Sequence, residues 1–151
     1  MSSDASLLMR RAIQALAAAL SVPCAVAFAV CGSPVNPDAT DPSLRGQVIG
    51  TWYSENQNPQ LGMVQRMYQT FLPTGVFEYK DQTCGNVPGV PCSQNYGHGV
   101  WNAARQNNGV IYIRIQFSDQ RRTNECTGWA ATFPDSNTMA MTTGGTARRV
   151  K

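Results

Sequence analysis

The sequence predicts an all-β protein: one small antiparallel up-and-down β-barrel of about seven or eight strands, preceded by an N-terminal leader or anchor segment. From Gly46 onward, short alternating runs of apolar and polar residues are separated by turn residues at the spacing of a sandwich or barrel. No stretch after residue 32 shows a helical period of useful length. A meander of this kind favours a closed barrel, because closure removes the exposed strand edges of an open sheet.

Eight segments in chain order have the pattern of strands. The strongest signal is in residues 110–117, where Ile111, Ile113 and Ile115 alternate with polar side chains. Turn residues separate the segments, such as Pro73-Thr74-Gly75 and Asn107-Asn108-Gly109. The expected strands are residues 48–54, 63–72, 76–82, 96–102, 110–117, 125–133, 138–141 and 146–150.

The N-terminal part divides into two segments before the barrel. Residues 1–29 have a basic start, an apolar middle and a small-residue site at Ala27-Phe28-Ala29, the three parts of a secretory leader. The apolar run is also long enough to cross a bilayer once, so a retained membrane anchor or a lipoprotein signal is the alternative. Residues 30–45 hold three prolines and no apolar period, and are expected to be a Pro/Asp-rich linker. The barrel then occupies residues 46–151.

The cysteines point to an oxidising compartment. Cleavage after Ala29 removes Cys24 and leaves an even four, which suggests two disulfides. Cys84 and Cys92 bracket a turn-rich loop, which leaves Cys31 to pair with Cys126. In the rival interpretation, Cys31 carries a lipid. The expected location is periplasmic or secreted, with a membrane-anchored protein facing the periplasm as the alternative; membrane contact is expected only through residues 12–31 or a lipid on Cys31.

The polar residues predict no catalytic or metal site. His98 is the single histidine, flanked by glycines, and lacks the companion ligands or nucleophile that metal binding or covalent catalysis needs. Glu55, Glu78 and Asp81 show no evident pairing, and Glu78 is expected to face solvent. Arg121-Arg122 is expected to lie in a solvated loop, with a docking patch as the alternative. The net charge of +3 is small and scattered, which argues against a nucleic-acid partner. No cofactor is expected.

The phrase Gly50-Thr51-Trp52-Tyr53 resembles the opening strand of the calycin superfamily, the lipocalins and their relatives. The chain looks like the short bacterial lipocalin-like proteins, in which a phrase such as Phe71-Leu72-Pro73-Thr74-Gly75-Val76-Phe77 forms the next hairpin. The resemblance covers roughly residues 46–150. It implies that Trp52 closes the barrel floor and that an arginine of the last strand, Arg148 or Arg149, lies across its ring. The chain departs from longer lipocalins in having no segment for a C-terminal helix.

Aromatic residues on different strands suggest a binding cavity. Those expected to line it are Tyr68, Tyr79, Trp101, Tyr112 and Trp129. A barrel of about eight strands either fills its interior with side chains or holds one small ligand, so plain core packing is the alternative. Four methionines have the same two interpretations, as adaptable lining or as core: Met63, Met67, Met139 and Met141.

The sequence therefore predicts an exported lipocalin-like barrel that binds a small apolar or amphipathic ligand. The alternative is an interaction protein, either an inhibitor of secreted proteases acting through residues 30–45 or an accessory subunit of a membrane-associated assembly. A disulfide or a lipid on Cys31 would keep that tail from entering a protease cleft. No catalytic constellation is visible, so an enzyme is the last choice.

Overall fold

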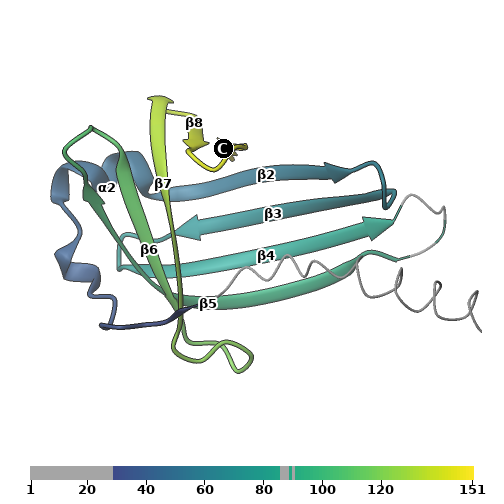
Figure 1. Cartoon of the computed structure of the whole chain (residues 1–151), viewed down its shortest axis with the longest axis horizontal. Coiled ribbons are helices and arrows are strands. Elements are labelled where there is room, and N and C mark those ends of the chain that lie inside the picture. The colour runs from purple at the N-terminus through teal and green to yellow at the C-terminus, as the bar shows by residue number, and fades with distance from the viewer. Residues whose placement is uncertain (1–28, 86–88, 90) are drawn as a thin grey trace, which may run out of the picture.

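The computed structural model describes residues 29–85, 89 and 91–151, and these residues form a closed eight-stranded antiparallel β-barrel (Figure 1). The predicted fold class is confirmed. Residues 1–28 of the expected leader lie outside the described residues. The elements are β1 (Ala29–Val30), η1 (Pro37–Ala39), α2 (Pro42–Val48), β2 (Gly50–Asn58), β3 (Met63–Phe71), β4 (Val76–Gly85), β5 (Ser93–Arg105), β6 (Ile111–Phe117), β7 (Glu125–Asp135), β8 (Thr138–Met141) and β9 (Thr146–Arg149). None of the helices in these residues is long and apolar enough to span a membrane.

The barrel is a meander whose last hairpin is much shorter than the rest. Strands β2 to β7 pair with their neighbours in chain order. The four-residue strands β8 and β9 fill the place between β7 and β2, and so close the sheet on itself. The short strand β1 pairs with the beginning of β7, at Cys126 and Glu125. In Figure 1 the long strands β2 to β5 extend well beyond the place where β6 and β7 cross them.

The apolar core occupies one end of the barrel. Alternation along the strands turns Trp52, Phe71 and Phe77 inward together with the isoleucines of β6. Helix α2 closes this end by burying Leu44 and Val48 against the same cluster (Figure 1). The core residues are Leu44, Val48, Trp52, Phe71, Phe77, Trp101, Ala103, Ile111, Ile113, Ile115, Phe117, Ala131, Met139 and Ala147. We call this end the closed end.

The segment before β2 differs from the expected linker, and the prediction of no helix after residue 32 was wrong. Residues 37–39 form a 3₁₀ turn and residues 42–48 an α-helix, each with a proline in its first turn. The side chains of Asn36 and Asp41 cap these turns by accepting hydrogen bonds from the backbone N–H groups of Asp38 and Ser43. A seven-residue helix has only about two turns and so shows no hydrophobic periodicity. The capping residues were the only indication of it in the sequence.

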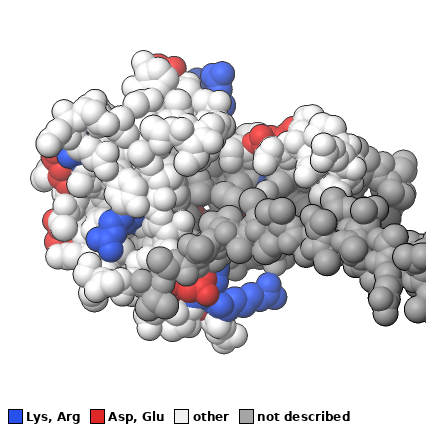
Figure 2. Space-filling model, in the orientation of Figure 1, with Lys and Arg blue, Asp and Glu red and all other residues white. Residues whose placement is uncertain are grey.

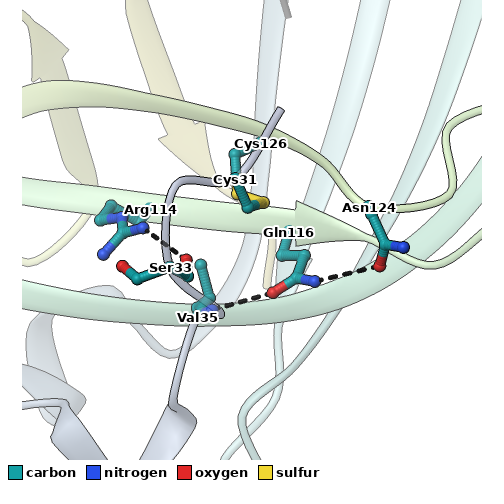
Figure 3. Close-up of a disulfide and its surroundings, with 7 residues drawn as sticks. All are labelled: Cys31, Ser33, Val35, Arg114, Gln116, Asn124 and Cys126. Atoms are coloured by element: carbon teal, nitrogen blue, oxygen red, sulfur yellow. Dashed lines mark hydrogen bonds between the residues drawn. A yellow bond between two sulfur atoms is a disulfide. The ribbon is translucent and has the colours of Figure 1, made fainter. Parts of the chain in front are cut away.

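Two disulfides hold outlying segments to the barrel, as the cysteine spacing predicted. Cys84–Cys92 closes the end of the β4–β5 hairpin, and Cys31–Cys126 joins the N-terminal segment to β7 (Figure 3). Beyond Cys31, the carbonyl oxygen of Ser33 accepts a hydrogen bond from Arg114 and the N–H of Val35 donates to Gln116. The disulfides are consistent with an oxidising extracellular or periplasmic environment.

Trp52 and Arg149 join the two ends of the sheet at the closed end. The guanidinium carbon of Arg149 lies 4.4 Å from the centroid of the Trp52 ring, and the indole N–H donates to the carbonyl oxygen of Val48 at 2.8 Å. The guanidinium also donates to the carbonyl oxygens of Gln47, Ile49 and Ser136. Arg148 is one residue earlier in β9 and lies on the outer face. Arg149 is therefore the arginine that lies across Trp52.

Gly50 is required beside this arginine. Its φ is +133°, a backbone conformation that side-chain-bearing residues rarely adopt. A Cβ at this position would lie 2.7 Å from Nη1 of Arg149. The spacing of glycine and tryptophan in Gly50-Thr51-Trp52 thus makes room for a guanidinium and supplies the ring on which it stacks.

Replacing Arg149 by lysine is expected to lower the free energy of unfolding by about 2–4 kcal/mol, because one ammonium cannot reproduce the planar stack and the carbonyl contacts. The matched control is Arg148→Lys on the outer face, which should change stability by less than about 0.5 kcal/mol. Urea unfolding measures both. Equal losses would contradict the assigned role of Arg149.

The two disulfides are expected to differ in their stabilising effect. They close segments with sequence separations of 95 and 8 residues, so loop-closure entropy favours the Cys31–Cys126 bond. The paired change Cys31→Ser with Cys126→Ser should cost about 4–5 kcal/mol, and Cys84→Ser with Cys92→Ser about 2–3 kcal/mol. Denaturant unfolding of the two double variants tests this order. A reversed order would show that native contacts, rather than chain entropy, dominate.

Candidate functional site

The inner surface of the barrel changes character along its length. Toward the closed end it is apolar, whereas toward the other end, which we call the mouth, the inward positions of β2, β3 and β4 carry mostly polar side chains. Continuing the alternation from Trp52 and Phe71 places Ser54 and Gln69 inward, and farther residues follow the same parity. The polar inner residues at the mouth are Ser54, Asn56, Asn58, Gln65, Gln69, Asp81 and Thr83.

A cavity of about 380 Å³ lies at the mouth, where β2 faces the turn between β8 and β9. This volume is within the range of small-molecule binding pockets. Its walls combine apolar side chains, including Met67 and Met141, with amides and hydroxyls. We call it the mouth cavity. It is lined by Ser54, Glu55, Asn56, Gln65, Met67, Gln69, Trp129, Met141, Gly144, Gly145 and Thr146.

Trp129 contributes its side chain to this wall. Its ring contacts Phe71 at 6.4 Å between centroids. Its Nε1 atom is buried and has no hydrogen-bond partner among the residues that the structure describes. The other two indoles differ, because Trp52 donates to Val48 and Trp101 to Leu72. A buried unpaired donor of this kind costs about 1–3 kcal/mol.

The charged groups around the mouth have partners within the protein. Gln65 donates its amide to both carboxylate oxygens of Asp81, each at 3.2 Å. At the rim, the hydroxyl of Tyr53 donates to Glu55, which also pairs with Arg66 at 3.2 Å. The Tyr53 hydrogen bond, followed by those from Gln57 and Arg66, lowers the pKa of the Glu55 carboxyl, which is ionised at neutral pH. The site therefore favours a neutral amphipathic group over a free ion.

A second, larger hollow lies over β3, β4 and β5, beside the loop that follows β6. Its volume is about 810 Å³. It is lined by Tyr68, Thr70, Glu78, Tyr79, Lys80, Gln94, Asn95, Tyr96, Gly97, His98, Asp119, Gln120 and Arg121. Many of these side chains lie on the outer face of the sheet. On the face shown in Figure 2, basic side chains lie apart from one another with acidic ones between them.

The five aromatic residues expected to line a cavity do not meet in one place: Tyr68 and Tyr79 border the larger hollow, and the other three lie elsewhere. Trp129 lines the mouth cavity, and Tyr79 points inward under the loop that follows β6. Trp101 is buried in the apolar core. Tyr68 lies on the outer face against Tyr53, with ring centroids 4.9 Å apart, and Tyr112 is on the outer face of β6. Alternation along each strand determines which face a side chain occupies. Tyr112 lies between Ile111 and Ile113, which face inward, so Tyr112 faces outward.

The methionines divide in the same way. Met67 and Met141 line the mouth cavity, whereas Met139 is fully buried in the core and Met63 is 36% exposed at the far end of β3. The inward amides Gln65 and Gln69 and the rim residue Asn56 were not singled out from the sequence. Extending the parity of Trp52 and Phe71 along their strands would have placed them inside.

His98 faces an acidic residue across the β4–β5 ladder. His98 and Glu78 lie opposite each other on β5 and β4, and both are exposed, as expected for Glu78. Among the described residues, no three histidines, cysteines or carboxylates gather at metal-binding distance.

The basic loop after β6 is partly packed. The guanidinium of Arg122 lies 3.8 Å from the ring centroid of Phe117 and 4.3 Å from that of Tyr79, and it pairs with Asp119. Burial lowers the pKa of Arg122. Arg121 is exposed and donates to Asn95. Arg122 thus covers the core from the mouth side. Of the two arginines expected in a solvated loop, Arg121 is exposed and Arg122 is packed against aromatic rings.

Replacing each of two tryptophans by phenylalanine separates a satisfied indole from an unsatisfied one. Trp101→Phe removes a hydrogen bond, whereas Trp129→Phe removes a donor that has no partner among the described residues. We expect the free energy of unfolding of Trp129→Phe to lie within about 1 kcal/mol of that of the unchanged protein. That of Trp101→Phe should be about 1–3 kcal/mol lower than that of Trp129→Phe. Urea unfolding of the two variants measures the difference. If Trp129→Phe is the more damaging change, its N–H is satisfied within the protein.

Comparisons of the chain with protein-family models, curated protein sequences and solved structures found no match. The site is therefore interpreted from its own geometry.

Proposed function

We propose that this protein is an exported lipocalin-like barrel of the calycin type, which binds a small amphipathic ligand in the mouth cavity. The observation that carries the proposal is the mouth cavity itself, whose wall combines inward amides with the side chains of Trp129 and two methionines. The amide of Gln69 in this wall can donate to or accept from a polar group of such a ligand. Met67 and Met141 offer adaptable apolar contact to the rest of such a molecule.

Two features support export to the periplasm or the outside of the cell. The two disulfides need an oxidising compartment to persist. The N-terminal sequence has the composition of a secretory leader, whether cleaved or retained. The calycin assignment is supported by the closed barrel and by the stacking of Arg149 on Trp52.

The alternative of a protease inhibitor acting through residues 30–45 has less support. This segment is tied to β7 through Cys31 and to the outer face of β6 through Ser33 and Val35 (Figure 3). Helix α2 buries Leu44 at the closed end. A segment held at these points is not free to enter a protease cleft, so we favour the mouth cavity.

The neutral dye propionyl-dimethylaminonaphthalene, an apolar ring system with one carbonyl acceptor, tests the proposal by fluorescence titration. We expect saturable binding to the folded full chain, and Trp129→Phe should weaken it about 2–10-fold, because the smaller ring gives up part of the contact in the cavity wall. Met67→Trp, which fills the cavity, should reduce binding further. Tyr112→Phe on the outer face is the matched control and should leave the dissociation constant unchanged.

Two results would contradict the proposal. The first is an absence of saturable dye binding by the unchanged protein. The second is dye binding that Trp129→Phe and Met67→Trp leave unaltered, which would place the dye outside the mouth cavity.

A further inference from the structure

Strand β2 loses one of its two neighbours halfway along its length. On one side it pairs with β3 over all nine of its residues, Gly50–Asn58. On the other side the ladder to β9 ends at Tyr53, although β9 continues past it through Ala147 and Thr146. None of the described residues pairs with residues 54–58 on this side. Strand β9 is only four residues long and runs from the turn at Gly144 and Gly145. The barrel therefore has a seam beside residues 54–58.

The backbone groups that face this seam follow from the ladder itself. The carbonyl oxygen of Thr51 accepts a hydrogen bond from Val150, so the backbone of Thr51 points toward β9 rather than β3. Backbone direction alternates along a strand. The N–H and C=O groups of Glu55 and Gln57 therefore point into the seam. Residues 55–58 are exposed.

This edge has little of the usual protection against strand pairing. Native edges are commonly blunted by charged side chains, proline or bulges. Residues 54–58 read Ser-Glu-Asn-Gln-Asn, with neither proline nor lysine, and they pair with β3 in regular register. The charge of Glu55 is engaged by Arg66 on the outer face. The edge is thus a regular row of donors and acceptors at strand spacing.

The seam opens directly onto the mouth cavity. Ser54, Glu55 and Asn56 belong to the cavity lining on one side, and Gly144 and Gly145 belong to it on the other. The two glycines have no side chains to narrow the opening. The side chain of Trp129 belongs to the same lining. A ligand lying along β2 therefore has its inward-pointing groups in the cavity.

We propose that the seam binds an extended polypeptide segment, which adds a strand to the free edge of β2 and places one amide-bearing side chain in the mouth cavity, beside the inward amides of Gln65 and Gln69. The inference rests on the proposed function and names the class of ligand for the same cavity. A peptide matches both features at once: its backbone pairs with Glu55 and Gln57, and its side-chain period of two directs alternate residues inward. A free lipid or aromatic molecule would leave the backbone row unused.

The test uses acetylated heptapeptides in which threonine alternates with one guest residue: glutamine, glutamate, methionine or valine. Each has a twin that is N-methylated at alternate residues, which removes one edge of backbone donors but keeps the side chains. Binding to the folded full chain is followed by the indole N–H proton resonances, with Trp129 assigned from Trp129→Phe. We expect the glutamine peptide to bind and its N-methylated twin to bind at least about 10-fold more weakly.

A matched pair of variants tests the protein's side of the ladder. Gln57→Ala and Gln57→Pro remove the same side chain, but only the proline removes the backbone N–H that faces the seam. This N–H lies outside the ladder to β3, so dye binding should report a folded barrel in both. We expect Gln57→Ala to bind the peptide within about 2-fold of the unchanged protein, and Gln57→Pro about 10-fold more weakly.

The outcomes separate the inference from the proposed function. If no peptide binds while the dye still does, the strand-addition inference is overturned and the small-ligand function stands. If the peptides bind but N-methylation has no effect, recognition is by side chains and the inference is again overturned. If neither peptide nor dye binds, both proposals fail. The N-methylated twins are tested on the unchanged protein, so their result does not depend on the folding of any variant.

Discussion

The stacking of Arg149 on Trp52 is the interaction on which the closure of this barrel depends. It lies where β9 meets β2, at a ladder of two residue pairs that completes the ring of strands. So short a ladder contributes few backbone hydrogen bonds. The guanidinium adds hydrogen bonds to three carbonyl oxygens, those of Gln47 and Ile49 before β2 and of Ser136 in the turn before β8. One side chain thus joins the closing hairpin, the end of α2 and the first strand.

Concentrating the closure at one end leaves the other end open in two respects. The long strands β2 to β5 extend beyond the short hairpin, and their inner faces carry amides and hydroxyls where the closed end carries aromatic rings. Among the described residues, strand β2 also lacks a second neighbour there. The mouth cavity and the seam therefore have one cause, which is the early end of the ladder between β2 and β9. The two disulfides hold the segments that lie away from this closure, which are the end of the β4–β5 hairpin and the N-terminal segment.

Much of the scaffold was predictable because its signals are local. Alternation located the strands, and turn residues located most of their ends. The first strand begins at Gly50, two residues later than expected, because Val48 ends a helix. That helix was missed because seven residues cannot show a period, although Asp41-Pro42 is a recognisable start. Tyr68 and Tyr112 were assigned to the interior by residue type, yet their parity with inward-facing neighbours places them outside.

By itself, the sequence determined the alternation within each strand, the four cysteines available for two disulfides and the place of Gly50-Thr51-Trp52 at the first strand. Each of these depends on residues close together in the chain or on which cysteines remain to be paired. Only the tertiary structure decided that Arg149 rather than Arg148 contacts Trp52 and that the indole N–H of Trp129 has no acceptor among the described residues. It also decided that β2 extends beyond its ladder with β9. These features depend on where strands far apart in sequence end beside one another. Alternation within one strand carries no information about the length of another.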